Sequence, residues 1–291
     1  MKKIGLLIVV IALIFSSCSD DGDGNDPSNS KYGCTDPKSV NYNPDAKEDD
    51  GSCLYPEQKV VPWVLEFTST CCPPCGEWGH ETMASLTNTF GNKIVPIAVH
   101  TNLNSCTDPM FIGELANSFR NNFPYSGIPS FFIANTKDKS EETINNYLDL
   151  NPLASCVFTA VRSGDKYTIK ALTQFYDNPN GDFYYGDFYI NAFVTENRID
   201  GSESSGSYNQ AGNDDDEYYH VHVLRTGART DNMCGYKIAG GIVPDDTSVI
   251  NNMTIQLNSN WNKSHLDVVC VIFFRQTGGT KFKFVNANHK N

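Results

Sequence analysis

The sequence predicts an α/β domain followed by an all-β antiparallel sandwich, and three observations support that fold class. First, a C-x-x-C motif, Cys72-Pro73-Pro74-Cys75, stands between an apolar stretch typical of a buried strand and a segment typical of a helix. Second, strand-like and helix-like segments alternate between residues 57 and 150. Third, the segments after residue 152 are rich in β-branched and aromatic residues and are separated by Gly, Asn, Asp and Ser.

In the predicted α/β domain, residues 57–150, capping residues mark where two of the helices begin. Asp108 precedes a proline and Ser140 precedes two glutamates, a pattern that suits helix N-termini because oxygen atoms there accept from free N–H groups. The first helix is expected to bury Trp78, Met83, Leu86 and Phe90. The expected strands are Val60–Thr68, Lys93–His100 and Ser130–Ala134, and the expected helices are Pro74–Phe90, one beginning at Asp108, and Ser140–Leu148.

The predicted sandwich domain, residues 152–291, contains about seven strand-like segments. Turn-forming residues separate the segments, as expected for antiparallel strands joined by loops. The longest polar tract, Asp200–Asp216, is expected to form a loop. The expected strands are Ala154–Arg162, Tyr167–Tyr176, Phe183–Glu196, Tyr218–Arg225, Thr247–Leu257, Leu266–Arg275 and Phe282–Ala287.

The C-x-x-C motif predicts thiol–disulfide chemistry. At a strand-to-helix turn the helix N–H groups favour a thiolate, so Cys72 is expected to be the nucleophile and Cys75 the resolving thiol. Gly127-Ile128-Pro129-Ser130 comes directly before an apolar strand, where thioredoxin-like proteins carry a cis proline beside the C-x-x-C. These signatures together predict that the α/β domain is thioredoxin-like. Its catalytic residues would be Cys72, Cys75 and Pro129, with no cofactor beyond the thiols.

Two other interpretations of the motif stay open. The Cys72–Cys75 pair could be a structural disulfide that braces a secreted domain, or it could bind copper together with Cys71 and either His80 or His100. Structural zinc is disfavoured because the sequence has no second C-x-x-C.

The remaining cysteines and histidines give weaker signals. Cys106 is a candidate partner for Cys71, and Cys234–Cys270 is the best further guess for a disulfide in the sandwich. His220-x-His222 would place two imidazoles on one face of a strand, where packing is a commoner role than metal binding.

The N-terminus is predicted to be a targeting segment. Lysines at positions 2 and 3 precede the apolar Ile4–Phe15, and two serines then precede Cys18, which resembles the lipobox of a bacterial lipoprotein. Residues 1–17 are therefore expected to be a signal peptide, and Cys18 to be the lipidation site that anchors the chain to a membrane. Residues 18–32 are expected to be a flexible acidic tether. Acidic residues directly after Cys18 predict an outer-membrane lipoprotein, either surface-exposed or facing the periplasm.

Between the tether and the α/β domain, residues 33–53 are predicted to form a small module closed by a Cys34–Cys53 disulfide. The stretch has few apolar residues and many turn formers, so it needs a covalent staple. Calcium binding by Asp45, Asp49 and Asp50 is left open. The whole chain carries 34 acidic and 22 basic residues with no basic patch, which argues against nucleic-acid binding.

The chain resembles the Omp-twenty-eight-related family of outer-membrane lipoproteins. The resemblance rests on Glu66-Phe67-Thr68 before the C-x-x-C, on Gly127-Ile128-Pro129-Ser130 and on His220-Val221-His222-Val223-Leu224-Arg225. It implies a thioredoxin-like domain followed by a β-sandwich in a surface lipoprotein or adhesin. The expected partners are therefore either protein thiols and disulfides, for an oxidoreductase, or a cell-surface ligand, for a binding protein in which the thioredoxin-like domain is a scaffold. Cys71, the two prolines of the motif and the 33–53 module depart from the family pattern.

Overall fold

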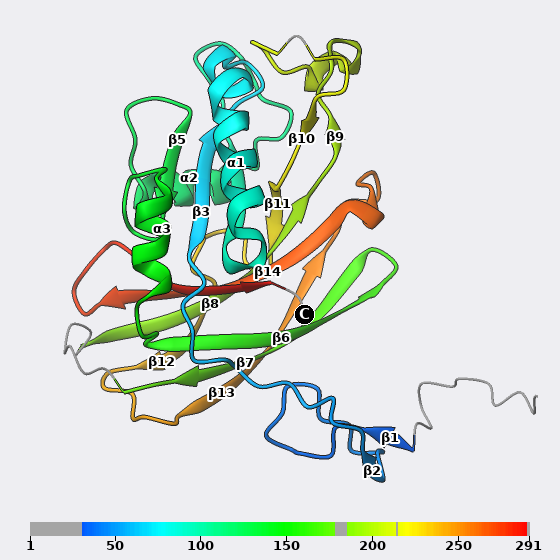
Figure 1. Ribbon diagram of the computed structural model, residues 1–291, viewed down its shortest axis with the longest axis vertical. Coiled ribbons are helices and arrows are strands. Elements are labelled where there is room, and N and C mark those ends of the chain that lie inside the picture. Colours follow the sequence, from blue (N-terminus) through cyan, green and yellow to red (C-terminus); the bar gives the residue numbers. More distant parts are fainter. Residues whose placement is uncertain (1–30, 178–184, 214, 290–291) are drawn as a thin grey trace, which may run out of the picture.

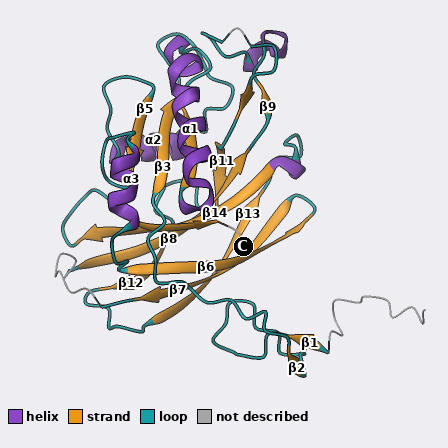
Figure 2. Cartoon of the chain, viewed as in Figure 1, coloured by secondary structure: helices purple, strands orange, loops and turns teal. Residues whose placement is uncertain are grey.

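A computed structural model describes residues 31–177, 185–213 and 215–289. The predicted signal peptide, Cys18 and residues 18–30 of the predicted tether lie outside these ranges. Strands hold 38% of the described residues and helices 19%, as the predominance of orange in Figure 2 illustrates. Within the described ranges, no helix combines the length and apolar character needed to cross a bilayer.

A mixed eight-stranded sheet forms the centre of the molecule (Figure 1). Strands β3 (Trp63–Thr68) and β4 (Val95–His100) are parallel, and β5 (Ser130–Ile133) is antiparallel to β3. Strand β11 (Val223–Gly227) is parallel to β4 and antiparallel to β8 (Gly186–Glu196), and it therefore joins the two halves of the sheet. The order is β15 (Lys283–His289), β14 (Leu266–Gln276), β8 (Gly186–Glu196), β11 (Val223–Gly227), β4 (Val95–His100), β3 (Trp63–Thr68) and β5 (Ser130–Ile133), and β12 (Tyr236–Gly240) also pairs with β8.

The predicted fold class, an α/β thioredoxin-like domain followed by an all-β antiparallel sandwich, is wrong. Strands from both predicted domains lie in one continuous sheet, and most of the secondary structure is β. The decisive contact is at β4, which was expected to belong to the first domain alone: Val223 of β11 pairs with Ala98, and the Ala98 N–H donates to the His222 carbonyl at 2.8 Å. A local change of composition near residue 151 does not reveal this pairing, because the two strands are far apart in sequence.

The two faces of the large sheet are covered differently. Helix α2 (Gly113–Asn122) packs on one face, where Trp63, Leu65 and Phe193 contribute to its core. On the other face, α1 (His80–Phe90) and α3 (Glu141–Leu148) cover the end formed by β3 and β5. A second, three-stranded sheet covers the β8–β14 end of that face, in the order β13 (Ser248–Gln256), β7 (Lys166–Phe175) and β6 (Ala154–Ser163).

Several sequence predictions about individual elements can be compared directly with the structure. Ser140 caps α3, because its hydroxyl accepts from the Thr143 N–H at 3.2 Å, as predicted. Asp108 does not begin a helix: α2 starts at Gly113, and the Asp108 carboxylate is held by other partners described below. Trp78 is not buried but 38% exposed, whereas the other three predicted core residues of the first helix are buried.

A long connection follows β8 and reaches the end of the molecule where α1 begins (Figure 1). It contains the short strands β9 (Ile199–Asp200) and β10 (Tyr219–His220) and the 3₁₀ turn η3 (Glu203–Tyr208). The predicted strand Tyr218–Arg225 is interrupted because His222 has a positive φ of 56°. The two imidazoles therefore do not share a strand face as expected. Short 3₁₀ turns, η2 (Gly91–Lys93) and η4 (Lys263–His265), complete the helical elements.

The predicted N-terminal module packs against the three-stranded sheet through a small apolar cluster of Val40, Val157 and Leu172. A disulfide joins Cys34 to Cys53, with Cα atoms 4.8 Å apart. Two short strands, β1 (Tyr32–Gly33) and β2 (Glu48–Asp49), pair in parallel beside it.

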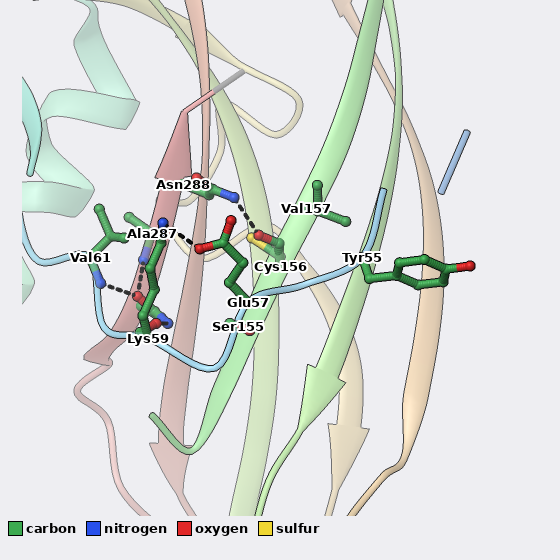
Figure 3. Close-up of a pocket in the computed structure, with 10 residues that line it drawn as sticks. Tyr55, Glu57, Lys59, Val61, Ser155, Cys156, Val157, Ala287 and Asn288 are labelled. Carbon is green, nitrogen blue, oxygen red and sulfur yellow. Dashed lines mark hydrogen bonds and ion pairs between the residues drawn. The ribbon is translucent and has the colours of Figure 1, made fainter. Parts of the chain in front are cut away.

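A linker carries the chain from this module into the large sheet, and it crosses a small cavity beside β6 and β15 (Figure 3). The side chain of Asn286 holds the linker there, because it accepts from the Val61 N–H at 2.8 Å and donates to the Lys59 carbonyl at 2.9 Å. The cavity measures about 30 Å³, enough for one or two water molecules. It lies beside the buried Cys156, and burial raises the pKa of that thiol to about 12, so the cavity holds no reactive thiolate.

Candidate functional site

The C-x-x-C motif lies where β3 gives way to α1. A π-helical turn, η1 (Cys75–Gly79), leads directly into α1, and the N–H groups of Cys75 and Gly76 donate to the Cys72 carbonyl at 3.0 and 3.3 Å. The two motif cysteines form a disulfide, with Cα atoms 5.2 Å apart. Both are only 2% exposed. The motif is therefore a buried disulfide at the start of a helical segment, a position that would stabilise a thiolate.

Pro129 lies beside the motif, as its place in the sequence suggested. The Ile128–Pro129 peptide bond is cis, and the Cys72 Sγ lies 3.7 Å from the Ile128 carbonyl oxygen. Gly79 packs against Pro129 and leaves little room for a side chain, since an added Cβ there would be 3.1 Å from both the Pro129 ring and Glu66 Oε1. The backbone carbonyl of Ile128 therefore contacts the predicted nucleophile.

Glu66 is a buried carboxylic acid directly behind the motif, and sequence reasoning assigned it no role. It belongs to β3, is 5% exposed, and burial raises its pKa to about 8. Glu66 and Cys75 line the same small cavity of about 20 Å³, which is large enough for one water molecule. At neutral pH this acid is therefore largely protonated and close to the resolving cysteine. A lone glutamate in an apolar strand just before a C-x-x-C was the signal that could have identified it.

Histidines and a tyrosine form part of the wall of this small cavity. His80, His100, Tyr218 and His220 all line it. Burial, with the nearby His100, lowers the pKa of His220 to about 3, so this imidazole is neutral and bonds the Tyr208 carbonyl at 2.8 Å. His80 and Tyr218 also line a second, more open cavity of about 660 Å³. Since Val221 lines both as well, the two cavities adjoin at His80, Tyr218 and Val221.

The open cavity is strongly acidic. The carboxylates that line it come from the start of the helical segment and from the connection before β10, namely Glu77, Glu81, Asp215 and Glu217. No lysine or arginine lines it within the part of the chain that the structure describes. Its negative field raises the local concentration of cationic groups beside the motif.

A buried contact between Asp108 and His100 braces the backbone just before the motif. The Asp108 carboxylate accepts from the Thr70 N–H at 2.7 Å and the Met110 N–H at 2.7 Å, and it pairs with His100 Nδ1 at 2.9 Å. Burial alone would raise the pKa of Asp108, but the His100 imidazole and these hydrogen bonds lower it to about 2. Cys71, which follows Thr70 in the chain, forms a disulfide with Cys106, with Cα atoms 6.4 Å apart. The loop from residue 100 to 110 is therefore fixed to the motif covalently and electrostatically.

The predicted Cys234–Cys270 disulfide is wrong. Both residues are free thiols, and they lie in the cores on opposite faces of the large sheet, so that the sheet itself separates them. Burial raises the pKa of Cys234 to about 11 and raises that of Cys270 well above its usual value. Neither is a reactive thiolate.

The arrangement of the described His, Cys, Asp and Glu side chains does not support a metal site. Within residues 31–177, 185–213 and 215–289, no group of three or more His, Cys, Asp or Glu side chains is arranged to hold a metal ion. In the module left open for calcium, Asp49 accepts from the Gly51 N–H at 2.7 Å and Asp50 from the Ser52 N–H at 2.9 Å. These carboxylates cap turns.

Among solved structures, the fold is similar to that of HBP35 of Porphyromonas gingivalis. The TM-score is 0.60 and the sequence identity is 16%, over 81% of this chain and 76% of that one. Weaker similarities cover 48% of this chain. One is to a domain of the outer membrane lipoprotein Omp28 from P. gingivalis (TM-score 0.28, 10% identity, 88% of that chain), and one is to the sporulation control protein Spo0M from Bacillus subtilis (TM-score 0.29, 11% identity, 48% of that chain). No family model and no curated protein matches the sequence. The similarity to HBP35 establishes a shared fold.

Proposed function

We propose that this chain exchanges thiols and disulfides with partner proteins through Cys72 and Cys75, as a lipid-anchored protein of the cell envelope. The observation that carries the proposal is the buried Glu66, whose pKa of about 8 lets it release and take up protons near neutral pH beside Cys75. A disulfide that served only as a brace would have no use for such an acid, and burying it costs stability.

The exchange conserves electrons and protons at each step. A partner thiolate attacks Cys72 Sγ, the Cys72–Cys75 bond breaks, and Cys75 leaves as a thiolate that takes the proton of Glu66. The second partner thiol then gives its proton to solvent, and its thiolate attacks the partner sulfur of the mixed disulfide. The bond to Cys72 breaks, Cys72 leaves as a thiolate, and two electrons have passed from the partner dithiol to the motif. The reverse sequence, in which Cys75–SH gives its proton to Glu66, reduces a partner disulfide.

The proposed roles follow from position. Cys72 is the sulfur nearer the start of the helical segment and lies beside the Ile128 carbonyl, where a partner chain would approach. Pro129 supports that backbone against Gly79 and is a positioning residue. Cys75 resolves the mixed disulfide, and it lines the small cavity that it shares with Glu66.

Trapping tests this proposal. The Cys75→Ser variant should accumulate mixed disulfides with envelope proteins, whereas Cys72→Ser should trap none while keeping the same far-UV circular dichroism spectrum. Equal amounts of trapped protein from both variants would exclude Cys72 as the nucleophile.

The second candidate function is that of a surface binding protein or adhesin with a structural Cys72–Cys75 disulfide. One observation favours it, namely that both sulfurs are only 2% exposed. In that case binding to a cell-surface ligand would survive substitution of both cysteines by serine in a chain that still folds. The reduction potential of the disulfide separates the two functions, because structural disulfides lie below about −300 mV.

A further inference from the structure

A five-residue segment, 209–213, lies across the C-x-x-C motif, and we call it the strap. It belongs to the long connection between β9 and β10, which reaches the start of α1 from the far half of the chain (Figure 1). The sequence suggested only a polar loop here. In the structure Gln210 is only 2% exposed, so this residue is buried although its neighbours in the strap are half-buried or exposed.

Hydrogen bonds join the strap to the backbone around the motif. The Gln210 Nε2 donates to the carbonyls of Ser69 at 3.1 Å and Cys72 at 3.0 Å. The Ala211 N–H donates to the Thr70 carbonyl at 2.8 Å. These bonds occupy three carbonyl groups of the segment that leads into the nucleophile.

Two glycines allow the strap to approach this closely. An added Cβ on Gly212, whose φ is +79°, would lie 2.3 Å from the Pro73 carbonyl oxygen. An added Cβ on Gly76 would lie 2.5 Å from the Ala211 carbonyl oxygen. A side chain at either position would force the strap away from the motif, since real Cβ atoms do not come so near to a backbone oxygen.

The burial of the motif conflicts with exchange between proteins. A partner sulfur must come into line with the Cys72–Cys75 bond, yet both sulfurs are 2% exposed. Something must therefore move. The motif itself is held by the helical segment and by the Asp108 brace, whereas the strap is the end of a long connection held there by the hydrogen bonds and glycine contacts described above.

We infer that the strap is an autoinhibitory cover, which closes the C-x-x-C in the state described and must be displaced before a partner polypeptide reaches Cys72. The inference rests on the proposed exchange function and adds its regulation. Because the reactive state is only a fraction of the population, the observed rate of exchange is the intrinsic rate multiplied by the fraction of molecules with the strap open.

The test compares three single variants of the chain with the wild type. Gln210→Ala removes two bonds of the strap, and Gly212→Ala pushes it from Pro73. Gly206→Ala is the matched control, because Gly206 lies in the same connection with a similar φ of +67° but has nothing within 4 Å of an added Cβ. The readout is the rate at which dithiothreitol, and separately a reduced C-x-x-C protein, reduces Cys72–Cys75, followed by alkylation and peptide mass spectrometry.

We expect Gln210→Ala and Gly212→Ala to be reduced about 5- to 30-fold faster than the wild type, and Gly206→Ala to be reduced at the wild-type rate. Unchanged rates in Gln210→Ala, with the circular dichroism spectrum intact, would overturn the inference even if Gly212→Ala failed to fold. An equal acceleration in the Gly206→Ala control would overturn it as well, because the effect would then come from loosening the whole connection. If the two strap variants are reduced faster but neither they nor the wild type oxidises a protein dithiol afterwards, the strap covers the motif and the proposed exchange function fails.

Discussion

Glu66 and Cys75 line one small cavity, although Glu66 lies in the middle of β3 and Cys75 is the first residue of the π-helical turn that leads into α1. Burial of the acid raises its pKa, and a hydrogen bond with Thr68 only partly offsets this effect. A protonated acid therefore lies close to Cys75, the inner sulfur of the C-x-x-C motif.

The Glu66→Gln substitution should change how stability depends on pH. The folded pKa of about 8 lies above the ordinary value of 4.5, so the wild-type free energy of unfolding is highest below about pH 4.5 and falls as pH rises towards 8. The loss should be on the order of a few kcal/mol by pH 8.5, and Glu66→Gln should remove it. Urea unfolding at pH 5 and pH 8.5 measures this. A wild-type stability that does not fall over this range would contradict a buried, protonated Glu66.

Glu66→Gln should also slow the step that Cys75 performs. Without a group to exchange the Cys75 proton, the mixed disulfide on Cys72 should persist at least about tenfold longer at pH 7. Quenching the reaction with acid at timed intervals and weighing the intact protein follows the intermediate. Glu77→Gln is the matched control, because Glu77 follows the motif closely but lines only the open cavity. A similar delay in that control would remove Glu66 from the mechanism.

Asp108→Asn should destabilise the fold by about 2 kcal/mol, because the buried carboxylate accepts from the Thr70 and Met110 N–H groups and pairs with His100. The folded pKa of about 2 lies below the ordinary 3.8, so the stabilisation is present above about pH 3.8 and is lost as pH falls through about 2. When unfolding is measured at decreasing pH, the free energy of unfolding should therefore fall less steeply in the variant than in the wild type. Asp45→Asn, at an exposed position, serves as the control. An equal effect of both substitutions would show that the contacts of Asp108 do not stabilise the fold.

The continuous sheet predicts that the described body of the chain unfolds as one unit. Trp63 of β3 packs against Phe273 of β14 at a centroid distance of 5.5 Å, and Phe273→Ala should cost about 3–5 kcal/mol. Far-UV circular dichroism and tryptophan fluorescence should shift together to a lower denaturant midpoint. If the helical signal kept its wild-type midpoint, the helices would belong to an independent unit.

Local features were predictable from the sequence, and long-range pairings were not. Alternation and turn residues located most of the longer strands but missed β12 and the short β1, β2 and β9, and Ser140 marked its helix, because these signals lie within a few residues of one another. The neighbour of β4 could not be predicted, since β11 lies more than a hundred residues later and pairs at Val223 alone. The same holds for the site: Cys72, Cys75 and Pro129 were found by motif, whereas Gln210 reaches the motif only through the fold.

The most direct test of the account is the reduction potential of Cys72–Cys75, measured in the folded protein by equilibration in redox buffers and mass spectrometry of alkylated peptides. A working exchange site predicts a value between about −120 and −270 mV. A value below about −300 mV would mark the disulfide as a structural brace and contradict the proposed function.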